Sequence, residues 1–142
     1  MSTILIVANQ TLPSEALATE VGGRIRSGAR DFHVVVPATP PANGGFTWDE
    51  EAARAAARER LDAFLERLRS QGARADGEIG DRDPVAAVRD AVRGRDIDEV
   101  ICSTLPAGVS RWLRQDVPSR IQGALALPVA VVIEREPVGA GR

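Results

Sequence analysis

Short apolar runs alternate with amphipathic segments along the whole chain. The runs that predict buried strands are residues 3–8, Asp31–Pro37, residues 98–104 and residues 128–133, with a more polar strand at residues 73–79. Nearly continuous runs of β-branched residues are typical of parallel strands that are buried on both faces. The polar composition of residues 73–79 instead favours a place at or near an edge of the sheet.

Four amphipathic helices separate these strands, and each has a recognisable start. Ser14, Thr47, Asp83 and Asp116 are predicted N-caps, because their side-chain oxygens accept hydrogen bonds from a first helical turn. Thr47 also forms a capping box with Glu50 and opens a long helix over residues 48–70. The residues predicted to face the core are Leu17, Val21 and Ile25; Leu61, Phe64, Leu65 and Leu68; Val85, Val88 and Val92; and Val117, Ile121, Ala124 and Leu125.

Pro118 sets the start of the last helix. An earlier start would put Pro118 in the helix interior at a cost of about 3 kcal/mol, whereas a start at Asp116 puts it in the first turn, where it is tolerated. Residues 105–115 are therefore predicted to be a loop or single turn over the strand ends, packed down by Trp112 and Leu113. A strand-loop-helix junction of this kind directs N–H groups at a bound anion, so this loop is the expected ligand site.

The alternation of strand and helix predicts an α/β domain with a five-stranded parallel sheet and helices on both faces. At 142 residues the chain is long enough for one such domain, over residues 1–134, followed by a flexible tail at residues 135–142. The longest apolar runs are far shorter than the roughly 20 residues of a membrane span. A single cysteine and no secretory signal favour the cytoplasm.

The amino-acid composition argues against several classes of function. All 18 basic residues are Arg, so there is no Walker-A lysine, Schiff-base lysine or pyridoxal phosphate attachment. A net charge of −2 with few aromatic residues gives no electrostatic reason to bind nucleic acid. His33 and Cys102 are too few for a triad or a His/Cys metal centre, and we expect His33 to be partly buried and hydrogen-bonded and Cys102 to belong to the core. The chain is therefore not expected to be an enzyme.

Three segments together resemble the universal stress protein family. The end of the chain, from ICSTLPAGVSR to PVAVVI, is similar to the family's strand, its Gly-Thr-His-Gly and Arg-x-Gly-x-Ser-Arg loop, and its last strand. ILIVANQ followed by Ser14-Glu15 is similar to the family's first strand and helix, and Gly80-Asp81 with Asp83-Pro84 to its Gly-Asp-Pro. The resemblance covers essentially the whole chain, and the order of elements agrees.

The resemblance implies a Rossmann-like sheet of the adenine nucleotide hydrolase type, with strand order 3-2-1-4-5. It also implies a homodimer formed through the last strand, Val129–Ile133, and in one branch of the family an ATP site in the loop after strand four. The residues that would contact the nucleotide are Asn9, Val36, Ser103, Gly108, Ser110, Arg111 and Asp116.

The phosphate motif is degenerate. Leu105 replaces the first glycine, Gln115-Asp116 replace the Gly-Ser that receives the phosphates, and Asn9 replaces an acidic residue. A carboxylate at the helix N-terminus repels phosphate and is expected to use the N–H groups that phosphate needs. The sequence therefore predicts a dimeric regulatory or binding domain with weak or absent ATP binding. A genuine ATP site with Mg²⁺ bridging Asp116, and a pure interaction module, are the alternatives; a hydrolase is the least favoured.

Overall fold

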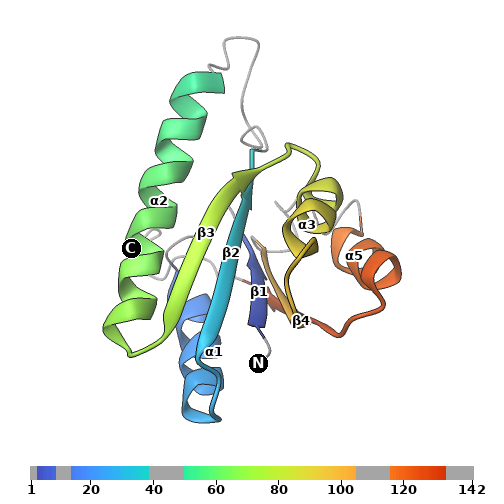
Figure 1. Ribbon diagram of the computed structural model, residues 1–142. Helices are drawn as coiled ribbons and strands as arrows, with labels where there is room; N and C mark the ends of the chain where they lie inside the picture. Colours follow the sequence, from blue (N-terminus) through green and yellow to red (C-terminus); the bar gives the residue numbers. More distant parts are fainter. Residues whose placement is uncertain (1–2, 9–13, 39–49, 105–115, 134–142) are drawn as a thin grey trace, which may run out of the picture.

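A computed structural model describes residues 3–8, 14–38, 50–104 and 116–133 of the chain. They form one five-stranded parallel sheet in the order β3-β2-β1-β4-β5 (Figure 1). The strands are β1 (Thr3–Val7), β2 (Asp31–Pro37), β3 (Arg74–Gly80), β4 (Ile97–Thr104) and β5 (Val129–Ile133). The helices are α1 (Glu15–Arg26), α2 (Glu50–Ser70), α3 (Pro84–Val92) and α5 (Val117–Leu125). The predicted class, strand order and alternation are confirmed.

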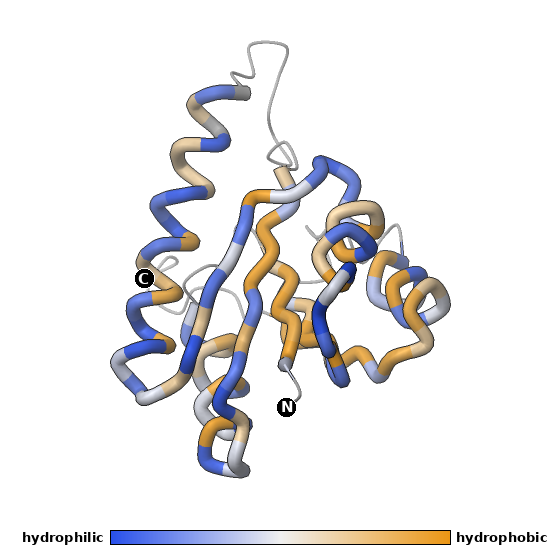
Figure 2. Tube along the Cα trace, viewed as in Figure 1, coloured by the Kyte–Doolittle hydropathy of each residue, from blue (hydrophilic) through white to orange (hydrophobic). Residues whose placement is uncertain are grey.

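The sheet has an apolar cluster on each face, because neighbouring residues of its central strands point in opposite directions. Ile4 and Ile6 of β1 lie in the cluster that α1 and α2 cover, while Leu5 and Val7 lie in the one that α3 and α5 cover. Figure 2 shows the central strands as the most hydrophobic part of the trace. Burial on both faces explains the unbroken apolar runs of the sequence.

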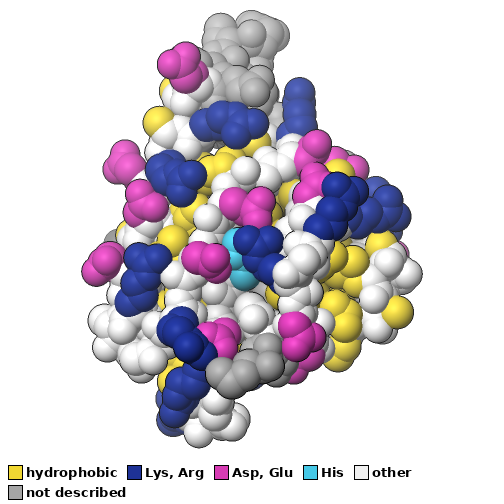
Figure 3. Space-filling model, in the orientation of Figure 1, with side chains coloured by type: hydrophobic (Ala, Val, Ile, Leu, Met, Phe, Trp, Pro, Cys, Tyr) yellow, Lys and Arg dark blue, Asp and Glu magenta, His cyan; other side chains and the backbone are white. Residues whose placement is uncertain are grey.

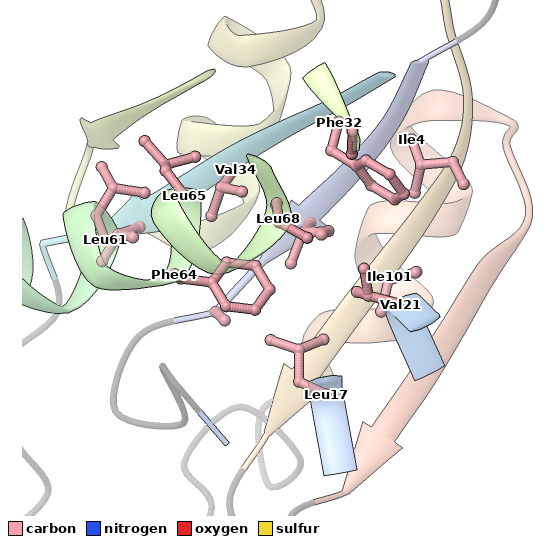
Figure 4. Packing of buried hydrophobic residues seen from close by; sticks show 14 of the residues in the cluster. Ile4, Leu17, Val21, Phe32, Val34, Leu61, Phe64, Leu65, Leu68 and Ile101 are labelled. Carbon is pink, nitrogen blue, oxygen red and sulfur yellow. The ribbon is translucent and has the colours of Figure 1, made fainter. Parts of the chain in front are cut away.

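Helix α2 supplies four large side chains to the first cluster. Its predicted stripe of Leu61, Phe64, Leu65 and Leu68 is buried and points toward Val34 of β2 (Figure 4). Leu17 and Val21 extend the cluster from α1. The period of the apolar positions therefore identified the buried faces of both helices.

Two of the predicted N-caps are confirmed by side-chain hydrogen bonds. The Leu17 N–H donates to Ser14 Oγ over 3.1 Å, and the Val85 N–H donates to Asp83 Oδ1 over 3.1 Å. Both caps have extended backbone, the conformation in which such a side chain reaches the first turn. Thr47 and the predicted first helical residues, 48 and 49, lie outside the described residues.

Two details of the predicted elements need correction. The strand predicted at residues 73–79 is displaced by one residue, because its ladder with β2 begins at the pair Asp31 and Arg74. Ala124 is exposed, although it was predicted to face the core. Pro118 is buried instead. The buried face of α5 therefore consists of Val117, Pro118 and Ile121, with Leu125 packed beside them. Within the described ranges, no helix combines the length and apolarity needed to cross a bilayer.

Candidate functional site

The strand order reverses between β1 and β4, so the helices that follow these two strands depart to opposite faces of the sheet. In parallel α/β sheets ligands bind beside the carboxyl ends of the strands at such a point. Here Val7 pairs with Cys102, which brings Ala8 beside Ser103 and Thr104 at the ends of the strands. Ser103 and Thr104 are buried polar residues, so this edge carries hydrogen-bonding groups within an otherwise apolar sheet.

Helix α5 begins beside this edge with Asp116 in an unusual conformation. Asp116 has φ 56° and ψ 39°, in the left-handed region, and its side chain makes no hydrogen bond to the first turn. The prediction that the carboxylate uses the N–H groups of α5 is therefore wrong. A capping side chain usually has extended backbone, as at Ser14, and Asp116 does not have it. Aspartate is one of the few residues besides glycine that enters this region at small cost.

The first turn of α5 still offers few donors. Pro118 has no N–H, and the Arg120 N–H already donates to the Asp116 carbonyl over 3.0 Å. The donors of this turn are thus the Val117 and Ser119 N–H groups. Asp116 is exposed, and its negative charge lies at the positive end of the helix dipole, where an anionic ligand would otherwise bind.

The structure describes three of the seven predicted nucleotide contacts. Val36 is fully buried in the cluster beneath α1 and α2, so only its backbone is placed to meet a ligand. Ser103 is buried at the end of β4, and Asp116 begins α5. The other predicted contacts lie outside the described residues: Asn9, Gly108, Ser110 and Arg111. The loop over residues 105–115, with Trp112 and Leu113, also lies outside them.

Cys102 shows how little nucleophilic chemistry this edge holds. The thiol is fully buried, and this burial raises its pKa to about 12. A thiol with so high a pKa is neither a nucleophile nor a ready metal ligand. Among the residues that the structure describes, no group of three or more His, Cys, Asp or Glu side chains is arranged to hold a metal ion. The prediction that Cys102 is a core residue is confirmed.

A second polar region lies at the amino-terminal ends of the strands. A cavity of about 380 Å³ opens on the face of β2 and β3, and Figure 3 shows the His33 ring there among Arg and acidic side chains. His33 is only 2% exposed, and its two ring nitrogens approach carboxylates of Asp76 and Glu78. The predicted burial and hydrogen bonding of His33 are confirmed, but these partners were missed. The signal was the alternation of charged residues along β3, which places Asp76 and Glu78 on one face.

No known protein-family model and no curated protein matches the chain. Solved structures do. A universal stress protein family structure from Burkholderia pseudomallei has a TM-score of 0.64 at 17% identity, covering 92% of this chain and 95% of that one. A universal stress protein from Archaeoglobus fulgidus has a TM-score of 0.61 at 18% identity, covering 93% of each chain. An Arabidopsis thaliana family protein with AMP bound has a TM-score of 0.62 at 13% identity, covering 98% and 97%.

These likenesses show that the chain has the fold of universal stress proteins. The predicted resemblance is thereby confirmed at the level of fold, over almost the whole length of each chain.

Proposed function

We propose that the chain is a regulatory binding domain of the universal stress protein type, without catalytic activity and with weak or absent ATP binding. The similarity of its fold to solved universal stress proteins supports the assignment to this type of domain. The chain has no Lys and one His, whose ring nitrogens both lie against carboxylates, and its one thiol is buried. These features leave little for acid-base, covalent or phosphate-transfer chemistry, and the cytoplasm remains the expected compartment.

Asp116 is the observation that carries the proposal of weak ATP binding. A triphosphate at the carboxyl edge of the sheet would approach the N-terminus of α5 and meet a carboxylate there. Pro118 removes one of the donors that could compensate. Charge repulsion and a reduced number of N–H groups therefore act in the same direction.

Adenine nucleotide binding with Mg²⁺ is the second candidate. The Arabidopsis neighbour contains AMP. In this chain, Asp116 leaves the N–H groups of Val117 and Ser119 uncapped by its side chain, and its carboxylate is a suitable oxygen ligand for a Mg²⁺ ion bound to phosphates.

Calorimetric titration with ATP, with and without Mg²⁺, separates the two. Asp116→Asn is the informative variant, because Asn also tolerates the left-handed conformation while it removes the charge. Asp90→Asn, on the exposed side of α3, makes the same change of charge elsewhere. No binding by wild type and Asp90→Asn, with binding gained by Asp116→Asn, supports the proposal. Micromolar binding by wild type contradicts it, and loss of that binding in Asp116→Asn only with Mg²⁺ present would support a bridging metal.

The exposed edge of β5 supports a homodimer. Strand β5 pairs with β4 on one side, and Val131 and Ile133 are 43% and 47% exposed. An apolar edge strand of this kind offers unpaired backbone groups and apolar side chains to a second strand. We therefore propose that two copies associate through Val129–Ile133. A monomeric mass in sedimentation at micromolar concentration would contradict this proposal.

A further inference from the structure

His33 lies between two carboxylates on the edge strand. Its Nδ1 is 2.8 Å from Asp76 Oδ1, and its Nε2 is 2.6 Å from Glu78 Oε2. An ionised carboxylate only accepts hydrogen bonds, and a neutral imidazole donates from one nitrogen. The two bonds therefore exist together only when both ring nitrogens carry a proton. His33 lies on β2, and both carboxylates lie on β3. The number of protons on the ring therefore determines how many hydrogen bonds His33 makes between the two strands.

The Asp76 and Glu78 carboxylates differ in how readily water or another group can replace the His33 ring as a partner. The Asp76 side chain is 70% exposed, so water replaces the ring at small cost. The Glu78 side chain is 39% exposed and also lies 3.8 Å from Arg95 Nη1, which fixes it from a second side. Arg95 in turn donates to the Ala91 carbonyl at the end of α3 over 2.8 Å. Glu78 is therefore the partner that a ring with a single proton retains.

Other charged groups surround the ring. The charged or titratable groups that line the cavity with His33, or bond to it, are Asp31 on β2, Arg74, Asp76 and Glu78 on β3, and Arg95 and Asp96 after α3. Arg74 is taken up by Asp31, to which it donates two hydrogen bonds of 2.6 and 3.1 Å. The hydrogen bonds that depend directly on the ring protons are those to Asp76 and Glu78.

We propose that His33 is a proton-dependent switch on the face of β2 and β3. The doubly protonated ring holds Asp76 and Glu78 together, and the neutral ring keeps its proton on Nε2, retains Glu78 and releases Asp76 to solvent. Loss of the proton makes this face more negative by one unit of charge and frees one side chain of the edge strand. The switch lies away from the carboxyl edge of the sheet, so it is independent of nucleotide binding.

Nitrogen-15 NMR of the ring tests this switch, and the single His makes the assignment unambiguous. Spectra are compared at two widely separated values, about pH 5 and about pH 9. We expect two protonated ring nitrogens in the acidic sample. In the alkaline sample we expect an Nε2–H tautomer, with a shift of the Asp76 backbone amide resonance larger than that of Glu78.

Two amide variants make the expectation specific. In Glu78→Gln the new amide can donate to the bare Nε2, so the neutral ring should instead carry its proton on Nδ1 and keep Asp76. In Asp76→Asn the amide can donate to Nδ1, so the Nε2–H tautomer should remain and the shift at residue 76 should disappear. A ring that keeps both protons in the alkaline sample, an Nδ1–H tautomer in wild type, or the same tautomer in wild type and Glu78→Gln would overturn the proposal.

Discussion

The two edge strands of the sheet are built in opposite ways. Strand β3 presents alternating charged side chains, and those of Arg74, Asp76 and Glu78 are engaged by groups on β2 or after α3. Strand β5 is apolar throughout and leaves Val131 and Ile133 among the most exposed large hydrophobic residues described. Figure 2 shows β3 with several hydrophilic positions in front of the hydrophobic central strands.

This difference assigns the two edges to different tasks. Charged side chains on an edge strand oppose its pairing with another chain, whereas an apolar edge must be covered or paired. Strand β3 is also joined to α2, whose Leu61 packs beside its Gly77. The contrast therefore predicts association through β5 and none through β3, and the following variants test it from the largest expected effect to the smallest.

Val131→Lys combined with Ile133→Lys should strongly weaken association through β5. Burial of a Val or Ile side chain stabilises by about 1.5–3 kcal/mol, and each 1.4 kcal/mol is a tenfold change in affinity. Val131 and Ile133 have less than half of their surface left to bury, but a dimer carries each substitution twice. The dimer dissociation constant should therefore rise by about a hundredfold or more, before charge repulsion is added. Sedimentation equilibrium over a range of concentrations measures this constant.

Gln71→Lys is the control for this experiment. It adds a positive charge at the turn between α2 and β3, where Gln71 is exposed, on the side of the sheet remote from β5. The dissociation constant should stay within a few-fold of wild type. If the lysines in β5 leave the dimer intact, or if the Gln71 variant dissociates equally, β5 is not the interface.

Gly77→Ala should weaken the attachment of β3 to α2. A Cβ at position 77 would lie 2.7 Å from Leu61 Cδ1 and 2.8 Å from the Val34 carbonyl oxygen. The leucine can shift but the backbone oxygen cannot, so we expect the free energy of unfolding to fall by about 1–3 kcal/mol, the usual effect of overpacking. Denaturant unfolding with a constant m-value measures it.

Gly123→Ala is the matched control on the β5 side of the molecule. Gly123 lies in α5, and apart from the backbone of that helix no atom of the described residues lies within 4 Å of an added Cβ. Alanine should raise the free energy of unfolding by about 0.5–1 kcal/mol, because glycine is the weaker helix former. A loss of stability similar to that of Gly77→Ala would mean that the crowding at Gly77 is not the cause.

Periodic features were the ones that could be predicted from the sequence. The apolar runs identified the strands, and the stripe from Leu61 to Leu68 identified the buried face of α2, since both depend only on spacing along the chain. Ser14 and Asp83 were predicted as caps because their partners lie within three residues. The resemblance to a family supplied the strand order.

Features that depend on backbone conformation or distant pairing could not be predicted. Asp116 occupies the expected cap position, but the sequence does not reveal its left-handed backbone, in which its side chain makes no hydrogen bond to the first turn of α5. The partners of His33 depend on the register of β2 and β3, which pairs residues 43 positions apart in the chain. All seven predicted nucleotide contacts stay predictions, and four of them, Asn9, Gly108, Ser110 and Arg111, lie outside the described residues.

Arg74→Gln should have the smallest effect on stability. Arg74 donates to both carboxylate oxygens of Asp31, but its side chain is 68% exposed, so solvent screens the pair. Such pairs contribute about 0.2–1 kcal/mol. A double-mutant cycle with Asp31→Asn should give a coupling energy in that range, measured by denaturant unfolding. A coupling above about 2 kcal/mol would contradict the comparison of the two edges, because β3 would then be held by its charges. A small coupling would mean that β3 is held by its ladder with β2 and by packing against α2. The role of the Arg74 charge would then be to oppose pairing with another strand.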